Sequence, residues 1–216
     1  MPVVTDITAQ KRSADIYNVF IDGEFVCGLS ALELSSAGVK VGLELSEDDV
    51  ARLIAQSRGS KAFNAALRYL SYRSRSEHEV RDYLVRKDYD DEIITATIDR
   101  LKQNEFVDDR AFAQSWLRSR QASAPRSQRV LRLELMKKRV PRDVIDSVLA
   151  EQDAGAETEA LRRVAEKKLR LARFSQDKQK LTQYLVAQGY SYGDVKGTLD
   201  ELTREDYEAH NGTNHN

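Results

Sequence analysis

The sequence predicts a mainly α-helical protein: three tandem three-helix units in an elongated, curved array, preceded by a small β-hairpin region. Only three prolines and ten glycines interrupt its 216 residues, which favours long helices. Apolar positions recur at intervals of 50 or 51 residues, as expected for stacked units of similar structure. Near the N-terminus, a two-residue turn separates two segments rich in β-branched and aromatic residues, which is the pattern of a hairpin.

The hairpin region is expected at residues 1–45. Residues 16–20 and 24–29 are candidate strands, and Asp22-Gly23 between them is a strong turn signal, because both turn positions need a positive φ. Residues 39–45 are a candidate for a further short strand. Residues 30–37 predict one or two helical turns that end at Gly38.

Helical patterns dominate the rest of the chain. Ser46 followed by Glu47, Asp48 and Asp49 predicts a capped helix start, with acids in the first turn where the helix dipole favours them. The apolar face of that helix continues to residue 57, and residues 62–70 are expected to form another helix.

The internal repeat defines the three units. Four sets of positions keep the spacing of 51 and then 50 residues: Val80, Leu131 and Leu181; Leu84, Leu135 and Leu185; Tyr89, Val140 and Tyr190; Ile94, Ile145 and Val195. The expected helices are 61–72, 75–87 and 90–103, then 108–121, 126–138 and 141–150, then 156–173, 176–188 and 191–204. Ser74, Pro125 and Ser175 are their equivalent helix-start positions.

These helices predict the domain organisation. We expect an N-terminal hairpin region with a linking helix at 1–58, followed by three-helix units at 59–105, 106–153 and 154–208. The polar residues 209–216 are expected to be a disordered tail.

A basic stretch is the strongest functional signal. Residues 116–142 contain a single acid, Glu134, and nine bases: Arg118, Arg120, Arg126, Arg129, Arg132, Lys137, Lys138, Arg139 and Arg142. On a helix that begins near Arg126, Arg129 and Arg132 would share its side. One interpretation is a solvated helix face. The near absence of acids favours the other, a partner surface that binds DNA phosphate or an acidic protein groove.

Other candidate residues have structural interpretations. Asp108-Asp109 precedes a helix and is expected to cap it, since no further carboxylates at ligand spacing support a metal site. Phe112 and Trp116 are four residues apart on an apolar face, which favours core packing over stacking on bases. Partner contact through Tyr69 and Tyr72 remains open.

No pattern indicates catalysis or a cofactor. Nucleotide-binding glycine motifs are absent, and Cys27, the only cysteine, is expected to fill a small apolar space. His78 is expected to be exposed. We find neither an apolar run of 18 residues nor a secretory signal pattern, so we expect a cytoplasmic protein that is not an enzyme, with no cofactor and no metal.

A family resemblance rests on motifs between Arg75 and Arg120: Arg75-Ser76-Glu77-His78-Glu79-Val80, Tyr83-Leu84, Lys87-Asp88-Tyr89, Leu101, Phe106-Val107-Asp108-Asp109, Arg110-Ala111-Phe112-Ala113, Trp116, Arg118 and Arg120. The pattern resembles that of the RecX family over residues 60–205. Asp88 stands where the family usually has glycine, but aspartate also adopts the left-handed conformation at a helix end.

The resemblance implies a fold of tandem three-helix units and a regulatory function. RecX proteins bind the RecA recombinase and its filament on single-stranded DNA, and they inhibit its ATPase, strand-exchange and co-protease activities. The resemblance implies RecA and its filament as partners, with DNA as a further candidate partner. We also expect no membrane partner and a monomer. The alternative is a general single-stranded DNA- or RNA-binding helical module, although such a module would be more basic overall than a chain with a pI near 6.4.

Overall fold

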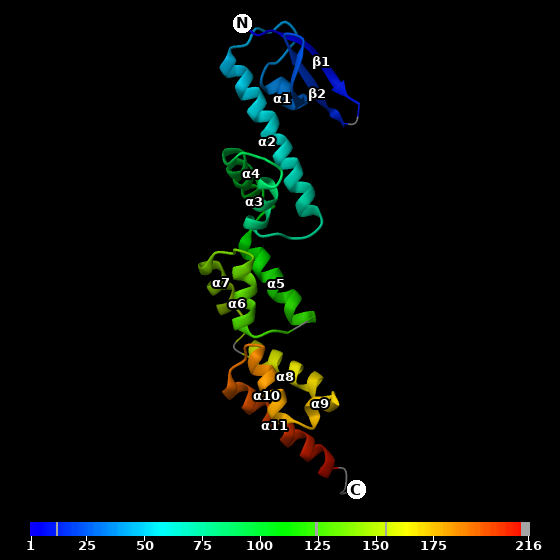
Figure 1. Cartoon of the computed structure of the whole chain (residues 1–216), viewed down its shortest axis with the longest axis vertical. Helices are drawn as coiled ribbons and strands as arrows, with labels where there is room; N and C mark the ends of the chain where they lie inside the picture. The colour runs from blue at the N-terminus through cyan, green and yellow to red at the C-terminus, as the bar shows by residue number, and fades with distance from the viewer. Residues whose placement is uncertain (12, 124, 154, 213–216) are drawn as a thin grey trace. The chain divides into compact units, whose positions relative to one another are not determined.

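The structure, a computed structural model, describes residues 1–11, 13–123, 125–153 and 155–212. It divides into two compact bodies. The N-terminal body comprises Met1–Ser74 and Glu79–Val107, and the C-terminal body comprises Arg75–His78 and Asp108–Asn216. Each body is mainly helical, as the sequence predicts (Figure 1).

The N-terminal body begins with an antiparallel sheet of β1 (Val4–Gln10), β2 (Ser13–Ile21) and β3 (Glu24–Ser30), in that order. The predicted turn is confirmed, because Asp22 and Gly23 have φ values of 50° and 84°. The further strand considered at residues 39–45 is wrong: this segment is a loop that forms a single bridge, from Val3 to Glu44. Its backbone groups form hydrogen bonds with residues at and just before the start of β1, but they do not form the regular ladder of a strand. One of these bonds runs from Leu45 N to Pro2 O (2.8 Å).

Two helices follow the sheet. The predicted helical turns are α1 (Ala31–Ser36). The predicted capping box at Ser46 is confirmed and begins α2 (Glu47–Ser71), which is one continuous helix rather than the two expected. Continuity follows from burial in both halves of the helix, because Leu53 packs in the core beneath the sheet and Ala62 in the next core. Between these residues, the buried Ser57 hydroxyl donates to Gly28 O (2.7 Å) and ties α2 to β3.

The second half of α2 forms the first three-helix domain with α3 (Glu77–Val85) and α4 (Asp91–Gln103). The core contains Val80, Leu84 and Ile94. Asp88 adopts the left-handed conformation with φ 57°, as expected, and ends the turn after α3.

The C-terminal body contains the second and third three-helix domains. The second domain comprises α5 (Asp109–Ser123), α6 (Gln128–Lys137) and α7 (Arg142–Ala150). The third comprises α8 (Ala156–Leu169), α9 (Ala172–Ser175), α10 (Lys178–Ala187) and α11 (Tyr192–Gly212). The helix expected at 156–173 is therefore divided into α8 and α9. The tail expected at 209–216 is helical as far as Gly212, and residues 213–216 lie outside the described residues.

The repeated apolar positions form the cores. Nine of them are at most 2% exposed: Val80, Leu84, Ile94, Leu131, Leu135, Ile145, Leu181, Leu185 and Val195. In the fourth set, Val140 and Tyr190 are buried, whereas Tyr89 is half-buried. The spacing of apolar residues in the sequence thus predicted which side chains pack together.

The helix starts lie two residues later than expected. Ser127 caps α6 by accepting from Val130 N (3.3 Å), and Asp177 caps α10 by accepting from Lys180 N (2.9 Å). Ser74, Pro125 and Ser175 therefore lie before α3, α6 and α10 instead of beginning them. A side chain that bonds a free first-turn amide defines the start better than a proline does.

A buried serine joins the second and third domains. The Ser127 hydroxyl donates to Gln188 O (2.9 Å), and the next residue, Gly189, has φ 91°. The equivalent bond also lies within the C-terminal body, where Ser76 Oγ donates to Lys138 O (2.8 Å) just before Arg139, with φ 57°. A left-handed helix end thus places a carbonyl against a serine at both positions.

Gly189→Ala is expected to destabilise the C-terminal body by roughly 2 kcal/mol, because alanine is strained at positive φ. In addition, its Cβ would overlap Ser127 Oγ and lie 3.1 Å from Val130 Cγ2. Thermal unfolding measures the effect. Gly197→Ala is the matched control: Gly197 lies within α11 and a Cβ there has no neighbour within 4 Å, so it should raise the melting temperature. Equal melting temperatures for Gly189→Ala and the unmodified protein would contradict the account of this junction.

Candidate functional site

The basic stretch spans the end of α5, the segment before α6, α6 itself and the first residue of α7. Arg126 precedes α6, so the expectation that it shares a helix side with Arg129 and Arg132 is wrong. The half-buried Arg126 instead turns towards the third domain, and its Nη1 donates to Gln188 Oε1 (2.6 Å).

Three other bases are engaged within the C-terminal body. Arg120 Nε donates to Glu134 Oε2 (2.7 Å), and the Arg120 guanidinium lies 4.6 Å from the centre of the Trp116 ring. The Trp116 indole N–H bonds the same carboxylate oxygen (2.7 Å), and Lys138 Nζ lies 5.4 Å from that ring. Arg132 pairs with an acid of α7, Asp146.

The remaining five bases are exposed: Arg118, Arg129, Lys137, Arg139 and Arg142. Among the described residues, their side chains form no ion pair. They come from three helices and the left-handed corner at Arg139. An incoming anion would therefore not have to displace an internal carboxylate from them.

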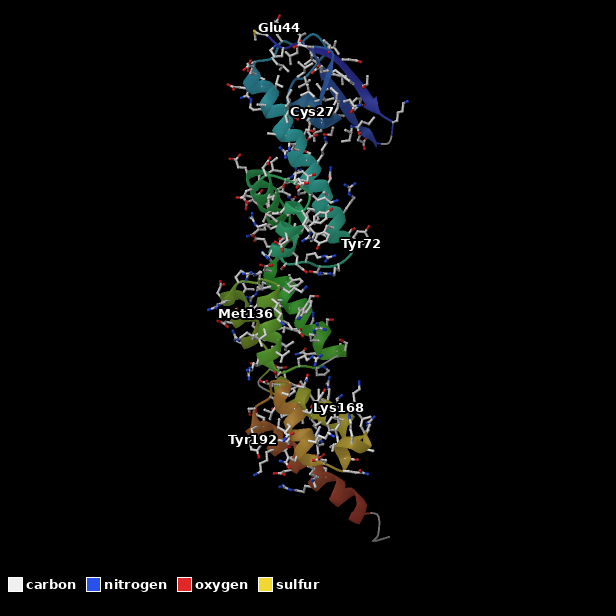
Figure 2. The ribbon with its side chains drawn as sticks, viewed as in Figure 1. Cys27, Glu44, Tyr72, Met136, Lys168 and Tyr192 are labelled. Atoms are coloured by element: carbon white, nitrogen blue, oxygen red, sulfur yellow. The ribbon has the colours of Figure 1, made fainter. Side chains whose placement is uncertain are left out.

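Exposed apolar side chains accompany these cations on α6. Leu133 is 48% exposed and Met136, labelled in Figure 2, is 37% exposed. Mixed apolar and cationic surface is typical of protein interfaces, in which methionine and arginine are enriched.

Other candidate residues have the structural roles expected of them. Asp108 accepts from Arg110 N (2.7 Å) and Ala111 N (3.1 Å), which confirms it as a cap of α5. Phe112 is buried in the core, with the half-buried Trp116 packed against it.

Two expectations about single residues concern the N-terminal part of the chain. Cys27 is buried, as expected, and burial raises the pKa of its thiol. His78 was expected to be exposed, but it is half-buried. Of the two tyrosines left open, Tyr69 stacks on Tyr83 with ring centres 4.2 Å apart, while Tyr72 is 84% exposed (Figure 2).

A groove that the sequence did not predict lies between the second and third domains, and we call it the cationic groove. It has a volume of about 350 Å³, and its lining includes four bases: Arg126, Arg163, Lys167 and Lys168. The last three were missed because α8 also carries Glu157, Glu159 and Glu166, which hide the bases in a charge count. The four-residue spacing of Arg163 and Lys167, which places them on one side of a helix, was the available signal.

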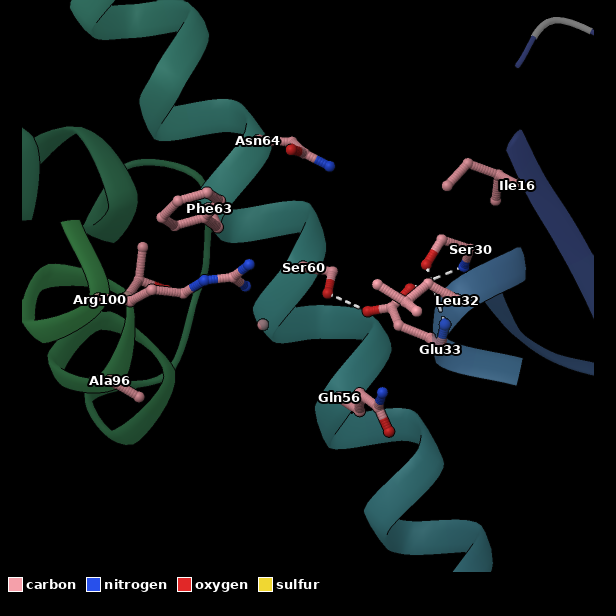
Figure 3. A pocket seen from close by; sticks show the side chains of 12 residues that line it. Ile16, Ser30, Leu32, Glu33, Gln56, Ser60, Phe63, Asn64, Ala96 and Arg100 are labelled. Carbon is pink, nitrogen blue, oxygen red and sulfur yellow. Dashed lines mark hydrogen bonds between the residues drawn. The ribbon is translucent and has the colours of Figure 1, made fainter. Parts of the chain in front are cut away.

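The N-terminal body has a separate cavity of about 480 Å³ between α1, α2 and α4 (Figure 3). Glu33 of α1 accepts hydrogen bonds from Ser30 N (2.7 Å) and from the Ser60 hydroxyl of α2. Burial raises the pKa of Glu33, but the bonds from Ser60 and Ser30 and the charge of Arg100 outweigh it and lower the pKa overall. On the opposite wall, the Arg100 guanidinium lies 4.1 Å from the centre of the Phe63 ring.

In the described residues, no helix is long and apolar enough to cross a membrane. The same residues contain no group of three or more His, Cys, Asp or Glu side chains that could hold a metal ion.

Tandem three-helix domains place the chain in the class of helical-repeat proteins. Sequence models of the RecX N-terminal domain and of the first, second and third RecX three-helix domains match residues 2–46, 62–101, 108–149 and 156–199. The chain belongs to the RecX family of regulatory proteins.

Several RecX proteins are similar to this chain over most of its length. A regulatory protein RecX of Halalkalibacterium halodurans is 35% identical, with 88% of this chain and 74% of that protein covered. One from Bacillus licheniformis is 32% identical, with coverage of 98% and 81%. A crystal structure of regulatory protein RecX has a TM-score of 0.77 at 25% identity and covers 93% of this chain and 100% of that one. RecX from Lactobacillus salivarius has a TM-score of 0.61 at 29% identity, with coverage of 68% and 97%.

Glu33→Gln should destabilise the N-terminal body by about 1 kcal/mol, because it weakens both the capping box of α1 and the tie to α2. Since the pKa of Glu33 is lowered on folding, the stabilisation is present above its unfolded pKa and is lost as the pH falls through its folded pKa. Denaturant unfolding at neutral and acidic pH tests this. The difference between variant and unmodified protein should shrink in acid, and a difference that grows there would contradict the assignment.

Proposed function

We propose that this protein binds the RecA recombinase and its filament on single-stranded DNA, and that it inhibits the ATPase, strand-exchange and co-protease activities of RecA. RecA is the expected partner because the chain belongs to the RecX family, and the binding surface is inferred from the structure of this chain. The observation that carries it is the set of five exposed bases in the second domain that have no ion-pair partner among the described residues.

Binding alone accounts for such inhibition. A protein that occupies the filament groove obstructs the second DNA and favours loss of RecA subunits, so no catalytic residue or cofactor is required. Linked domains strengthen the contact, because once one domain has bound, the next binds as an intramolecular event. The proposal includes a cytoplasmic location and a monomeric protein.

The alternative function is a general single-stranded DNA- or RNA-binding module. The exposed Leu133 and Met136 favour a protein partner over nucleic acid alone, because a phosphate backbone offers them nothing apolar to contact. Binding to bare single-stranded DNA and to a RecA-coated strand, measured at the same salt concentration, separates the two. Equal affinity for both would support the alternative.

The direct test is RecA-dependent ATP hydrolysis and strand exchange on single-stranded DNA with increasing amounts of the protein. We expect both activities to fall. If saturating protein left both unchanged, the proposed function would be wrong.

A triple variant, Arg129→Glu, Lys137→Glu and Arg142→Glu, tests the surface. Because these side chains are exposed and make no ion pair with the described residues, folding should be nearly unaffected. The half-inhibiting concentration should rise by roughly tenfold or more through repulsion at the interface. Lys40→Glu, Lys196→Glu and Arg204→Glu form a control of equal charge change, also at exposed positions. Equal loss of inhibition in both triple variants would point to net charge instead of this surface.

A further inference from the structure

We infer that the cationic groove between the second and third domains binds the phosphate backbone of single-stranded nucleic acid. The inference deepens the proposed function by assigning the DNA-contacting part of the chain. The groove is a site distinct from the exposed bases of α6 and α7. Arg126 is the only one of the nine bases in the basic stretch that lines it.

The charge of the groove is of one sign. Its lining contains four bases and no aspartate or glutamate. Arg163 pairs with Glu159 (2.9 Å), but this carboxylate is not part of the lining. Both side chains of the pair are exposed. Lys167 is exposed and forms no ion pair within the described part of the chain. A concave site with this lining concentrates anions more effectively than a flat surface of equal charge.

Two of the bases are held in place before any ligand arrives. Arg126 is fixed by its bond to Gln188, and its Nε is buried without a hydrogen-bond partner among the described residues. Lys168 Nζ lies 4.8 Å from the centre of the Tyr184 ring (Lys168 is labelled in Figure 2). Because their positions are already set, less side-chain entropy is lost when an anion binds.

The dimensions favour one nucleic-acid strand. Arg163 and Lys167 are one helical turn apart, about 6 Å along the axis of α8, which is on the order of the distance between consecutive phosphates of an extended strand. A groove of about 350 Å³ is small relative to a nucleic-acid duplex, so we expect it to hold a single backbone. The Tyr184 ring is already covered by Lys168 and contacts Phe174, with ring centres 5.3 Å apart. With Lys168 over the ring and Phe174 against it, we expect no base to stack there, and binding should be independent of sequence.

The test uses the full-length protein and a fluorescent oligothymidine, without RecA. The variant is Lys167→Gln with Lys168→Gln, and fluorescence anisotropy is measured across a range of salt concentrations. Each lost phosphate contact removes about 0.7 from the slope of log K against log salt, so the double variant should lower the slope by about 1.4. At about 50 mM salt its affinity should fall roughly tenfold to a hundredfold.

The control variant, Lys196→Gln with Arg204→Gln, removes the same charge from exposed positions of α11 outside the groove. It should keep nearly the affinity and slope of the unmodified protein. Circular dichroism and Trp116 fluorescence establish that both variants are folded. Undetectable binding by the unmodified protein, or equal affinity in the groove variant and the control, would overturn the inference.

A competition arm distinguishes the chemistry of the ligand. Unlabelled oligothymidine should displace the probe far better than polyglutamate of equal charge, and if polyglutamate competed equally well the groove would be assigned to an acidic protein segment and the inference would fail. RecA is absent from these measurements, so strand binding with no effect on RecA ATPase would overturn the proposed function and leave the groove assignment intact.

Discussion

The junction of the second and third domains depends on one hydrogen bond, from the hydroxyl of the buried Ser127 to the carbonyl of Gln188. The left-handed turn at Gly189 ends α10 and leaves that carbonyl without a helical partner, and the serine both caps α6 and satisfies it. Because Gln188 is half-buried, loss of the bond would cost at most the 1–3 kcal/mol that is about the penalty for a buried carbonyl left unpaired. The bond therefore fixes the start of one domain against a helix end of the next, and it places Arg126 beside Gln188 at the edge of the cationic groove.

The repeated core was predictable because its signal is local and apolar. Leu84, Leu135 and Leu185 are each buried, and their spacing alone identified them. The errors arose where tertiary contacts decide. Helix α2 continues through residue 59 because the sheet and the first three-helix domain each bury part of it, and no periodicity in the sequence reports that continuity. Residues 39–45 have a strand-like composition, but they contact the sheet as a loop.

The sequence predicted that the candidate site has an excess of basic residues, but it did not predict which of them form an exposed surface. Counting residues identified the basic stretch, but it could not show that Arg132 pairs with Asp146 or that Arg120 shares Glu134 with Trp116. Conversely, Lys167 escaped notice because the acids of α8 balance it in the sequence. Ion pairs form between residues that are neighbours in three dimensions. A count of charges along the sequence therefore includes some cations that are already paired and overlooks others that are free to bind.

The left-handed corner has a further consequence, because its three equivalents are Asp88, Arg139 and Gly189. The backbone turns in the same sense at each, although the side chains are acidic, basic and absent. Asp88 and Arg139 are exposed, whereas a side chain at Gly189 would overlap Ser127. The residue type at the corner can thus vary wherever the neighbouring domain leaves room for a side chain. A repeat protein built this way can diversify what it presents to partners one corner at a time, while its hydrogen-bonded framework stays the same.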